Sequence, residues 1–170
     1  PCKKTILGDA AQNVNPYSST TADDIRKALY KAEIMKLNKS YRSGYEITEL
    51  AKSISGNSEI DVVERHTEKP QLIEVSSREA ESQLMREMIM EVDVNNPTST
   101  AYIFKLEKDA IAFFESLGEL QKRATLLVSG CQAFTNGIVV TTSHMAKGLE
   151  FDEVVIPNVT KANYNDEMDK

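Results

Sequence analysis

Short apolar runs alternate with amphipathic segments along this chain of 170 residues. Runs rich in β-branched residues predict strands, and apolar positions spaced three and four apart predict helices. We expect helices at about 21–31, 45–54, 77–92 and 108–117, and strands at 4–7, 34–37, 71–75, 100–104, 125–128, 138–142 and 153–156. This alternation is typical of an α/β fold with a mostly parallel sheet flanked by helices, which is the fold class that we predict.

The most informative stretch is residues 137–157, GIVVTTSHMAKGLEFDEVVIP, in which two β-branched runs flank a polar turn. The first run predicts a buried strand, and the polar residues follow its C-terminal end. Open α/β sheets place their ligands at that end of the strands. A surface turn with ordinary capping is the alternative interpretation.

This stretch resembles motif V of the UvrD/Rep-type superfamily 1 DNA helicases, a strand followed by Thr-x-His-x-x-Lys-Gly-Leu-Glu-Phe and a second hydrophobic strand. The match consists of Thr142, His144 and residues 147–151. Upstream, residues 5–12 (TILGDAAQ) resemble motif III and residues 37–43 (LNKSYRS) resemble motif IV. The three blocks occur in the order of that family, and the resemblance implies a RecA-like domain of the P-loop NTPase type.

Two parts of a complete motor are missing from the sequence. It contains no Gly-Lys dipeptide, and therefore no Gly-x-x-x-x-Gly-Lys-Ser/Thr phosphate loop, and no arginine-bearing motif VI follows motif V. We therefore expect residues 1–20 to be the last strand and linker of a first RecA-like domain. Residues 21–170 would be the second motor domain, ending before motif VI and lacking a large accessory insertion. ATP and Mg²⁺ would be bound mainly by the missing first motor domain, so this chain alone is expected to be inactive.

The resemblance assigns five residues to the nucleotide. Arg42 would reach the γ-phosphate, which suits a planar, always charged guanidinium, and Gln12 would sense that phosphate through its amide. Tyr41 would lie against the adenine, Gly148 would allow close approach of the backbone, and Glu150 would accept a hydrogen bond from the ribose.

The sequence leaves alternatives open for two of these nucleotide residues. Arg42 could instead form a surface ion pair with Glu46 or Glu49, and Tyr41 could instead pack in a core.

Four further residues would contact single-stranded DNA. Tyr17 falls where the family often has an aromatic residue that stacks on a base, whereas a second such position carries Asn15 here. Thr142 and His144 would face the strand, with the imidazole neutral. Lys147 would touch a phosphate or, equally well, pair with an acidic residue.

Composition restricts the classes of function. The net charge of −6 disfavours strong independent binding to nucleic acid, so the chain alone should bind DNA weakly and should need the rest of its own protein as partner. The two cysteines and two histidines form no ligand cluster, so no metal site is predicted. No apolar run is long enough to span a membrane, and no signal peptide is recognisable, so we expect a cytoplasmic protein.

The function that follows from the resemblance is part of an ATP-dependent DNA helicase that moves 3′ to 5′ on single-stranded DNA and unwinds duplexes. A non-catalytic RecA-like interaction module is the main alternative. An RNA-acting or nuclease-fused relative is also compatible with the sequence.

Overall fold

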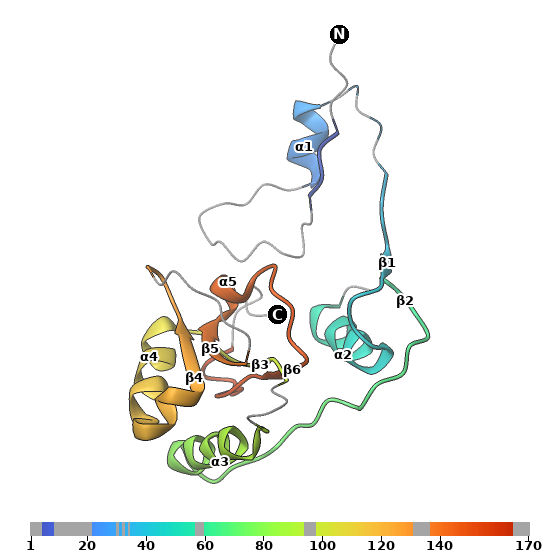
Figure 1. Cartoon of the computed structure of the whole chain (residues 1–170). Helices are drawn as coiled ribbons and strands as arrows, with labels where there is room; N and C mark the ends of the chain where they lie inside the picture. The colour runs from blue at the N-terminus through green and yellow to red at the C-terminus, as the bar shows by residue number, and fades with distance from the viewer. Residues whose placement is uncertain are drawn as a thin grey trace. The chain divides into compact units, whose positions relative to one another are not determined.

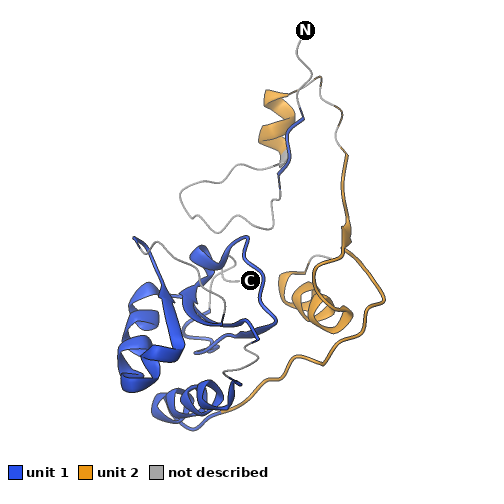
Figure 2. Ribbon diagram, in the orientation of Figure 1, with its two compact units in different colours: residues 1–18, 75–165 blue, residues 19–74, 166–170 orange. Residues whose placement is uncertain are grey.

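The computed structural model of the chain describes residues 5–8, 22–29, 31, 33, 35–56, 60–93, 98–130 and 137–164. The chain divides into two compact units, one of residues 1–18 and 75–165 and the other of residues 19–74 and 166–170 (Figure 2). Within the described residues, no helix combines the length and apolar character that crossing a membrane requires.

The first unit contains a four-stranded sheet (Figure 1). Its strands are β3 (Thr100–Phe104), β4 (Ala124–Leu127), β5 (Ile138–Thr142) and β6 (Glu153–Val155), in the order β4-β5-β3-β6. Every neighbouring pair is parallel. The predicted α/β class with a parallel sheet is therefore confirmed, and β3 and β5 have the bounds that the sequence predicts.

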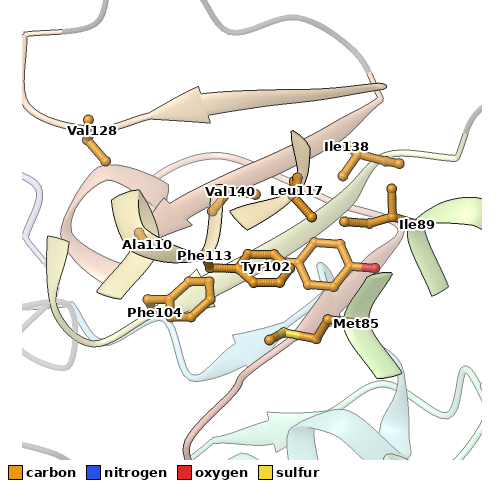
Figure 3. Close-up of a cluster of buried hydrophobic side chains, with 10 residues drawn as sticks. All are labelled: Met85, Ile89, Tyr102, Phe104, Ala110, Phe113, Leu117, Val128, Ile138 and Val140. Carbon is orange, nitrogen blue, oxygen red and sulfur yellow. The ribbon is translucent and has the colours of Figure 1, made fainter. Parts of the chain in front are cut away.

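Two helices cover one face of this sheet, α3 (Arg78–Glu91) and α4 (Glu107–Ser116), and the short 3₁₀ helix η2 (Gly118–Arg123) follows α4. Residues 102 and 104 of β3 and 138 and 140 of β5 point to the same face, because side chains alternate along a strand and partners in register share a side. Their side chains pack against the helices in a core cluster of Met85, Ile89, Tyr102, Phe104, Ala110, Phe113, Leu117, Val128, Ile138 and Val140 (Figure 3). This cluster anchors the two central strands.

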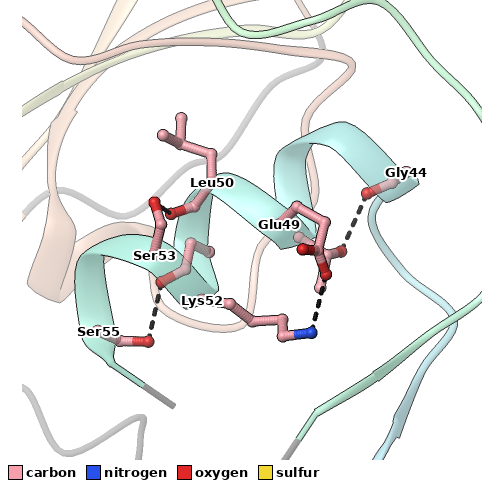
Figure 4. A network of polar contacts seen from close by, with 8 residues as sticks. Gly44, Glu49, Leu50, Lys52, Ser53 and Ser55 are labelled. Carbon is pink, nitrogen blue, oxygen red and sulfur yellow. Dashed lines mark hydrogen bonds and ion pairs between the residues drawn. The ribbon is translucent and has the colours of Figure 1, made fainter. Parts of the chain in front are cut away.

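The second unit contains α1 (Ala22–Ala28), α2 (Tyr45–Ser55) and two short parallel strands, β1 (Lys39–Ser40) and β2 (Asp61–Val62). Helix α2 has the predicted start and ends one residue later than predicted. It stops because Gly56 adopts φ 66°, the left-handed conformation that glycine accepts most readily, and donates its N–H to the carbonyl of Lys52. Side-chain contacts one turn apart line the helix, among them Lys52 to Glu49 at 2.8 Å (Figure 4).

Three predicted strands are wrong. Residues 5–8 are not in a strand, and Ile6 and Leu7 are 63% and 85% exposed. The first strand of the second unit lies at residues 39–40 instead of 34–37, and residues 71–75 form none. An apolar run becomes a strand only where a neighbour accepts its backbone hydrogen bonds, and the local pattern does not reveal that neighbour.

Candidate functional site

The residues that resemble motif V begin at the carboxyl edge of the four-stranded sheet, with Thr142, and run back to the start of β6 at the amino edge. Because the strands are parallel, all of them end at the carboxyl edge. Strand β5 ends at Thr142, directly beside Phe104, the last residue of the neighbouring strand β3. The short helix α5 (Ser143–Ala146) follows β5, and Lys105 follows β3. Residues far apart in the sequence are thus brought to one place.

The connections that leave β3 and β5 run in opposite directions across the sheet. The chain passes from β3 beyond β5 to reach β4, and from β5 beyond β3 to reach β6. Parallel crossovers are almost always right-handed, so opposite directions place the two connections on opposite faces. In open α/β sheets, ligands usually bind at the carboxyl ends of adjacent strands whose connections diverge in this way.

The turn after β5 exposes its polar side chains. His144, Lys147 and Glu150 are exposed, and Gly148 has φ 84°. A Cβ on Gly148 would meet no atom within 4 Å, so it is the positive φ, rather than crowding, that favours glycine here. The N–H of Leu149 donates to the carbonyl of Ala146 at 3.0 Å, which closes the turn. An imidazole, an ammonium and a carboxylate are therefore presented to solvent on one short turn.

Thr142 differs from the exposed His144, Lys147 and Glu150 because it is only 5% exposed. The preceding residue, Thr141, is fully buried and donates its hydroxyl to the carbonyl of Leu127 at 2.7 Å, which ties β5 to β4. The burial of Thr142 disfavours a contact between its side chain and DNA. His144 and Lys147 have the exposure that such a contact needs.

Sequence reasoning missed Lys105, the first residue after β3. Its ammonium donates a hydrogen bond to the carbonyl of Asn163 and lies 5.3 Å from the centre of the Tyr164 ring. A cation directly after the predicted strand 100–104 was visible in the sequence. The adjacency of that strand to β5 was not, because strand order depends on the whole sheet.

Tyr41 and Arg42 lie in the other unit, immediately after β1, and both are exposed. Tyr41 is 69% exposed, so it does not pack in the core of its unit, and the ammonium of Lys39 lies 5.6 Å from its ring centre.

The two acidic residues considered as alternative partners of Arg42 have other contacts. Glu46 accepts from His66 and Thr67, and Glu49 accepts from Lys52. A carboxylate can accept further hydrogen bonds beside these, so the ion pair stays an alternative interpretation of Arg42.

Two site residues predicted from the sequence, Gln12 and Tyr17, lie outside the described residues, as do both cysteines. Within the described ranges, no three His, Cys, Asp or Glu side chains gather into a group that could hold a metal ion.

No family model and no curated protein matches this chain. A solved structure does: the crystal structure of the C-terminal domain of a possible DNA helicase from Lactobacillus plantarum WCFS1. The two chains are 29% identical and superpose with a TM-score of 0.58, over 75% of this chain and 74% of that one. The similarity supports a helicase-related role, and in fold this chain resembles the C-terminal domain of a helicase.

Proposed function

We propose that this chain forms the second motor domain of an ATP-dependent DNA helicase of the UvrD/Rep type. The observation that carries the proposal is the position of the turn with His144, Lys147 and Glu150. This turn begins directly after the carboxyl end of β5, beside the end of β3, and its exposed side chains follow on the way back to β6. The similarity to the C-terminal domain of a possible DNA helicase supports the helicase-related part of this proposal.

In this proposal the segment after β5 and the residue after β3 serve both DNA and nucleotide. Lys147 and Lys105 would neutralise phosphates of a single strand, and His144 would donate or accept one hydrogen bond. Gly148 lets the backbone approach a ligand closely, and the Glu150 carboxylate would accept from the ribose of ATP. The surplus of acidic residues in the chain limits the affinity of this domain for DNA, so the rest of the protein would supply most of the positive groove.

By the resemblance, Arg42 and Tyr41 would also contact ATP. The exposed guanidinium of Arg42 would contact the γ-phosphate of ATP and stabilise the charge that develops during phosphoryl transfer. Tyr41 would lie against the adenine. Closure of the two motor domains on ATP and reopening after hydrolysis would move the domain along single-stranded DNA, 3′ to 5′. The roles of Gln12 in phosphate sensing and of Tyr17 in base stacking stay predictions.

The test is the Arg42→Ala variant of the full-length protein that contains this chain. We expect DNA-stimulated ATPase activity to fall by about 10³-fold or more, the range that such an arginine supplies, with the melting temperature unchanged. Arg26→Ala is the matched control, because Arg26 pairs with Asp23 at 2.7 Å on the surface of α1 in the same unit. Turnover by Arg42→Ala close to that of the Arg26→Ala control would refute the proposed role of Arg42.

A further inference from the structure

The loop that carries Arg42 is held by a segment from beyond β2. Strands β1 and β2 are parallel, and the residues that follow them, 42–46 and 63–67, are joined by hydrogen bonds. We propose that Arg65 and Glu46 are positioning residues that fix this loop so that the Arg42 guanidinium meets the phosphate of ATP. This inference rests on the proposed nucleotide role of Arg42.

Arg65 contacts the loop on both sides of Ser43 and Gly44. Its guanidinium donates from Nη2 to the carbonyl of Arg42 at 2.7 Å, and its own carbonyl accepts the N–H of Tyr45 at 2.9 Å. The backbone direction at Arg42 is therefore set by a charged donor that lies 23 residues later in the sequence. Charge-assisted hydrogen bonds are stronger than neutral ones, which makes Arg65 an effective anchor.

Glu46, in the first turn of α2, binds the segment that follows β2 through His66 and Thr67. One carboxylate oxygen meets Nδ1 of His66 at 2.8 Å, and the other accepts the N–H of Thr67 at 2.8 Å. The side chain of Glu46 is only 15% exposed. The Thr67 amide and the His66 ring lower the pKa of Glu46 to about 2, so the carboxylate is ionised throughout the functional pH range.

Gly44 makes the close approach of the two segments possible. A Cβ on Gly44 would lie 2.2 Å from Oγ1 of Thr67 and 2.5 Å from its Cγ2. The φ of Gly44 is −66°, which any residue adopts, so contact with Thr67 is the constraint rather than backbone strain. The carbonyl of Gly44 then accepts the N–H of Thr48 at 3.0 Å and starts α2.

These contacts fix the backbone on which the Arg42 side chain is mounted. A displacement of about 1 Å in a catalytic group can cost roughly 10²-fold in rate, so a loosened loop should lower turnover without removing the arginine itself. The loss should be smaller than that caused by Arg42→Ala. It should also affect kcat more than the KM for ATP, because the contact that is lost is made mainly in the transition state.

The experiment measures DNA-stimulated ATPase activity of the full-length protein with Arg65→Ala and Glu46→Ala, each alone and combined with Arg42→Ala. We expect each single variant to lower kcat by about tenfold or more with KM for ATP changed by less than about threefold. On the Arg42→Ala background the same changes should have no further effect, because the residue they position is gone. Arg65→Lys and Glu46→Gln, which keep a donor or an acceptor, should recover part of the activity and guard against misfolding.

The matched controls are Arg26→Ala for the arginine and Glu49→Ala for the glutamate, since Glu49 lies on α2 and pairs with Lys52. If Arg65→Ala and Glu46→Ala keep full activity, the positioning role is overturned and the nucleotide role of Arg42 still stands. The same follows if the two changes lower activity equally with and without Arg42. If Arg42→Ala itself keeps normal turnover, the proposed nucleotide role fails and the positioning role fails with it. The two failures are thereby distinguished.

Discussion

Ser99 and Asp152, 53 residues apart in the sequence, are joined by reciprocal hydrogen bonds at the amino ends of β3 and β6. The Asp152 carboxylate accepts the Ser99 N–H at 2.9 Å and the Ser99 hydroxyl at 2.7 Å. In return the Asp152 N–H lies 2.9 Å from both the carbonyl and the hydroxyl oxygen of Ser99. Because Asp152 lies two residues after Glu150, this pair also fixes the end of the turn that carries the candidate site.

Replacing Asp152 should destabilise the unit that contains the four-stranded sheet. Asp152→Ala removes the acceptor for two hydrogen bonds at an edge strand, so we expect the melting temperature to fall by several degrees. Glu119→Ala, at an exposed i,i+3 pair with Lys122, is the control and should change nothing measurable. Thermal unfolding followed by circular dichroism makes the comparison, and equal melting temperatures for the two variants would contradict the prediction.

The same pair makes stability depend on pH. The hydroxyl and amide of Ser99 lower the pKa of Asp152 below its ordinary value of 3.8. Its stabilising contribution is therefore fully present above about pH 4 and is lost as the pH falls through the lowered pKa. Urea unfolding between pH 7 and pH 2 should show a smaller acid-dependent loss in Asp152→Asn than in the unaltered chain.

Tyr102 should tolerate loss of its hydroxyl. The residue is fully buried between β3 and the helices, and among the described residues no hydrogen-bond partner for its hydroxyl is found. Burial, reinforced by the nearby Glu153, raises the pKa of the phenol and keeps it neutral. An unsatisfied buried polar group costs about 1–3 kcal/mol, so Tyr102→Phe should raise the free energy of unfolding or leave it unchanged.

Tyr102→Ala provides the contrast, because it also removes the ring that packs against Phe113 at a centroid distance of 6.0 Å. That change should lower the free energy of unfolding by about 3–5 kcal/mol. Denaturant unfolding measures both variants. Destabilisation of Tyr102→Phe by more than about 1 kcal/mol would mean that the hydroxyl has a partner after all.

The Glu46 carboxylate should keep its charge to unusually low pH. Its pKa is lowered from 4.5 to about 2 by the Thr67 amide first and the His66 ring second. A carboxylate with a depressed pKa stabilises the fold above the ordinary value, and that contribution is lost as the pH falls from about 4.5 towards 2. The amide proton of Thr67, followed by NMR, should report a midpoint near the lower value. A midpoint near 4.5 would contradict the contact, and Glu46→Gln should abolish the titration.

The elements that the sequence predicts best are those whose boundaries are set locally. Strand β5 is a β-branched run that ends in a polar turn, and helix α2 lies between Gly44 and Gly56. The predicted strand at 71–75 has a similar apolar run, yet Leu72 is 84% exposed and the segment forms no strand. Local periodicity shows which segments can form strands, but pairing depends on the rest of the chain.

The residues of the candidate site also divide into those that the sequence reveals and those that only strand pairing brings together. The turn from His144 to Glu150 is contiguous, so its residues could be found from the sequence. Lys105 reaches the same edge only because β3 pairs with β5, and Arg65 reaches Arg42 only because β1 pairs with β2. Strand order and register bring these residues together, and neither follows from spacing along the chain.

Lys147 should contribute to DNA binding through its charge. In the full-length protein, Lys147→Ala should weaken binding to single-stranded DNA to a similar extent for all sequences and reduce the slope of log affinity against log salt by about 0.7. Lys122→Ala is the control, because Lys122 lies on η2 before β4, at the opposite edge of the sheet, and pairs with Glu119. Fluorescence anisotropy at several salt concentrations measures both slopes. Equal slopes for the two variants would assign Lys147 to an ion pair instead.

Glu150 should discriminate between nucleotides by their ribose hydroxyls. If its carboxylate accepts a hydrogen bond from the sugar, Glu150→Ala should lower kcat/KM for ATP in the full-length protein by about tenfold, in the range of one charged hydrogen bond. For a deoxy-ATP that lacks the hydroxyl bonded by Glu150, the variant should leave kcat/KM unchanged. Assays with 2′-deoxy-ATP and 3′-deoxy-ATP therefore identify which ribose hydroxyl Glu150 contacts. Glu107→Ala is the control in the same unit, since the Glu107 carboxylate accepts the hydroxyl of Ser129 at 2.7 Å. An equal loss of kcat/KM with ATP and with both deoxynucleotides would show that Glu150 acts elsewhere than at the ribose.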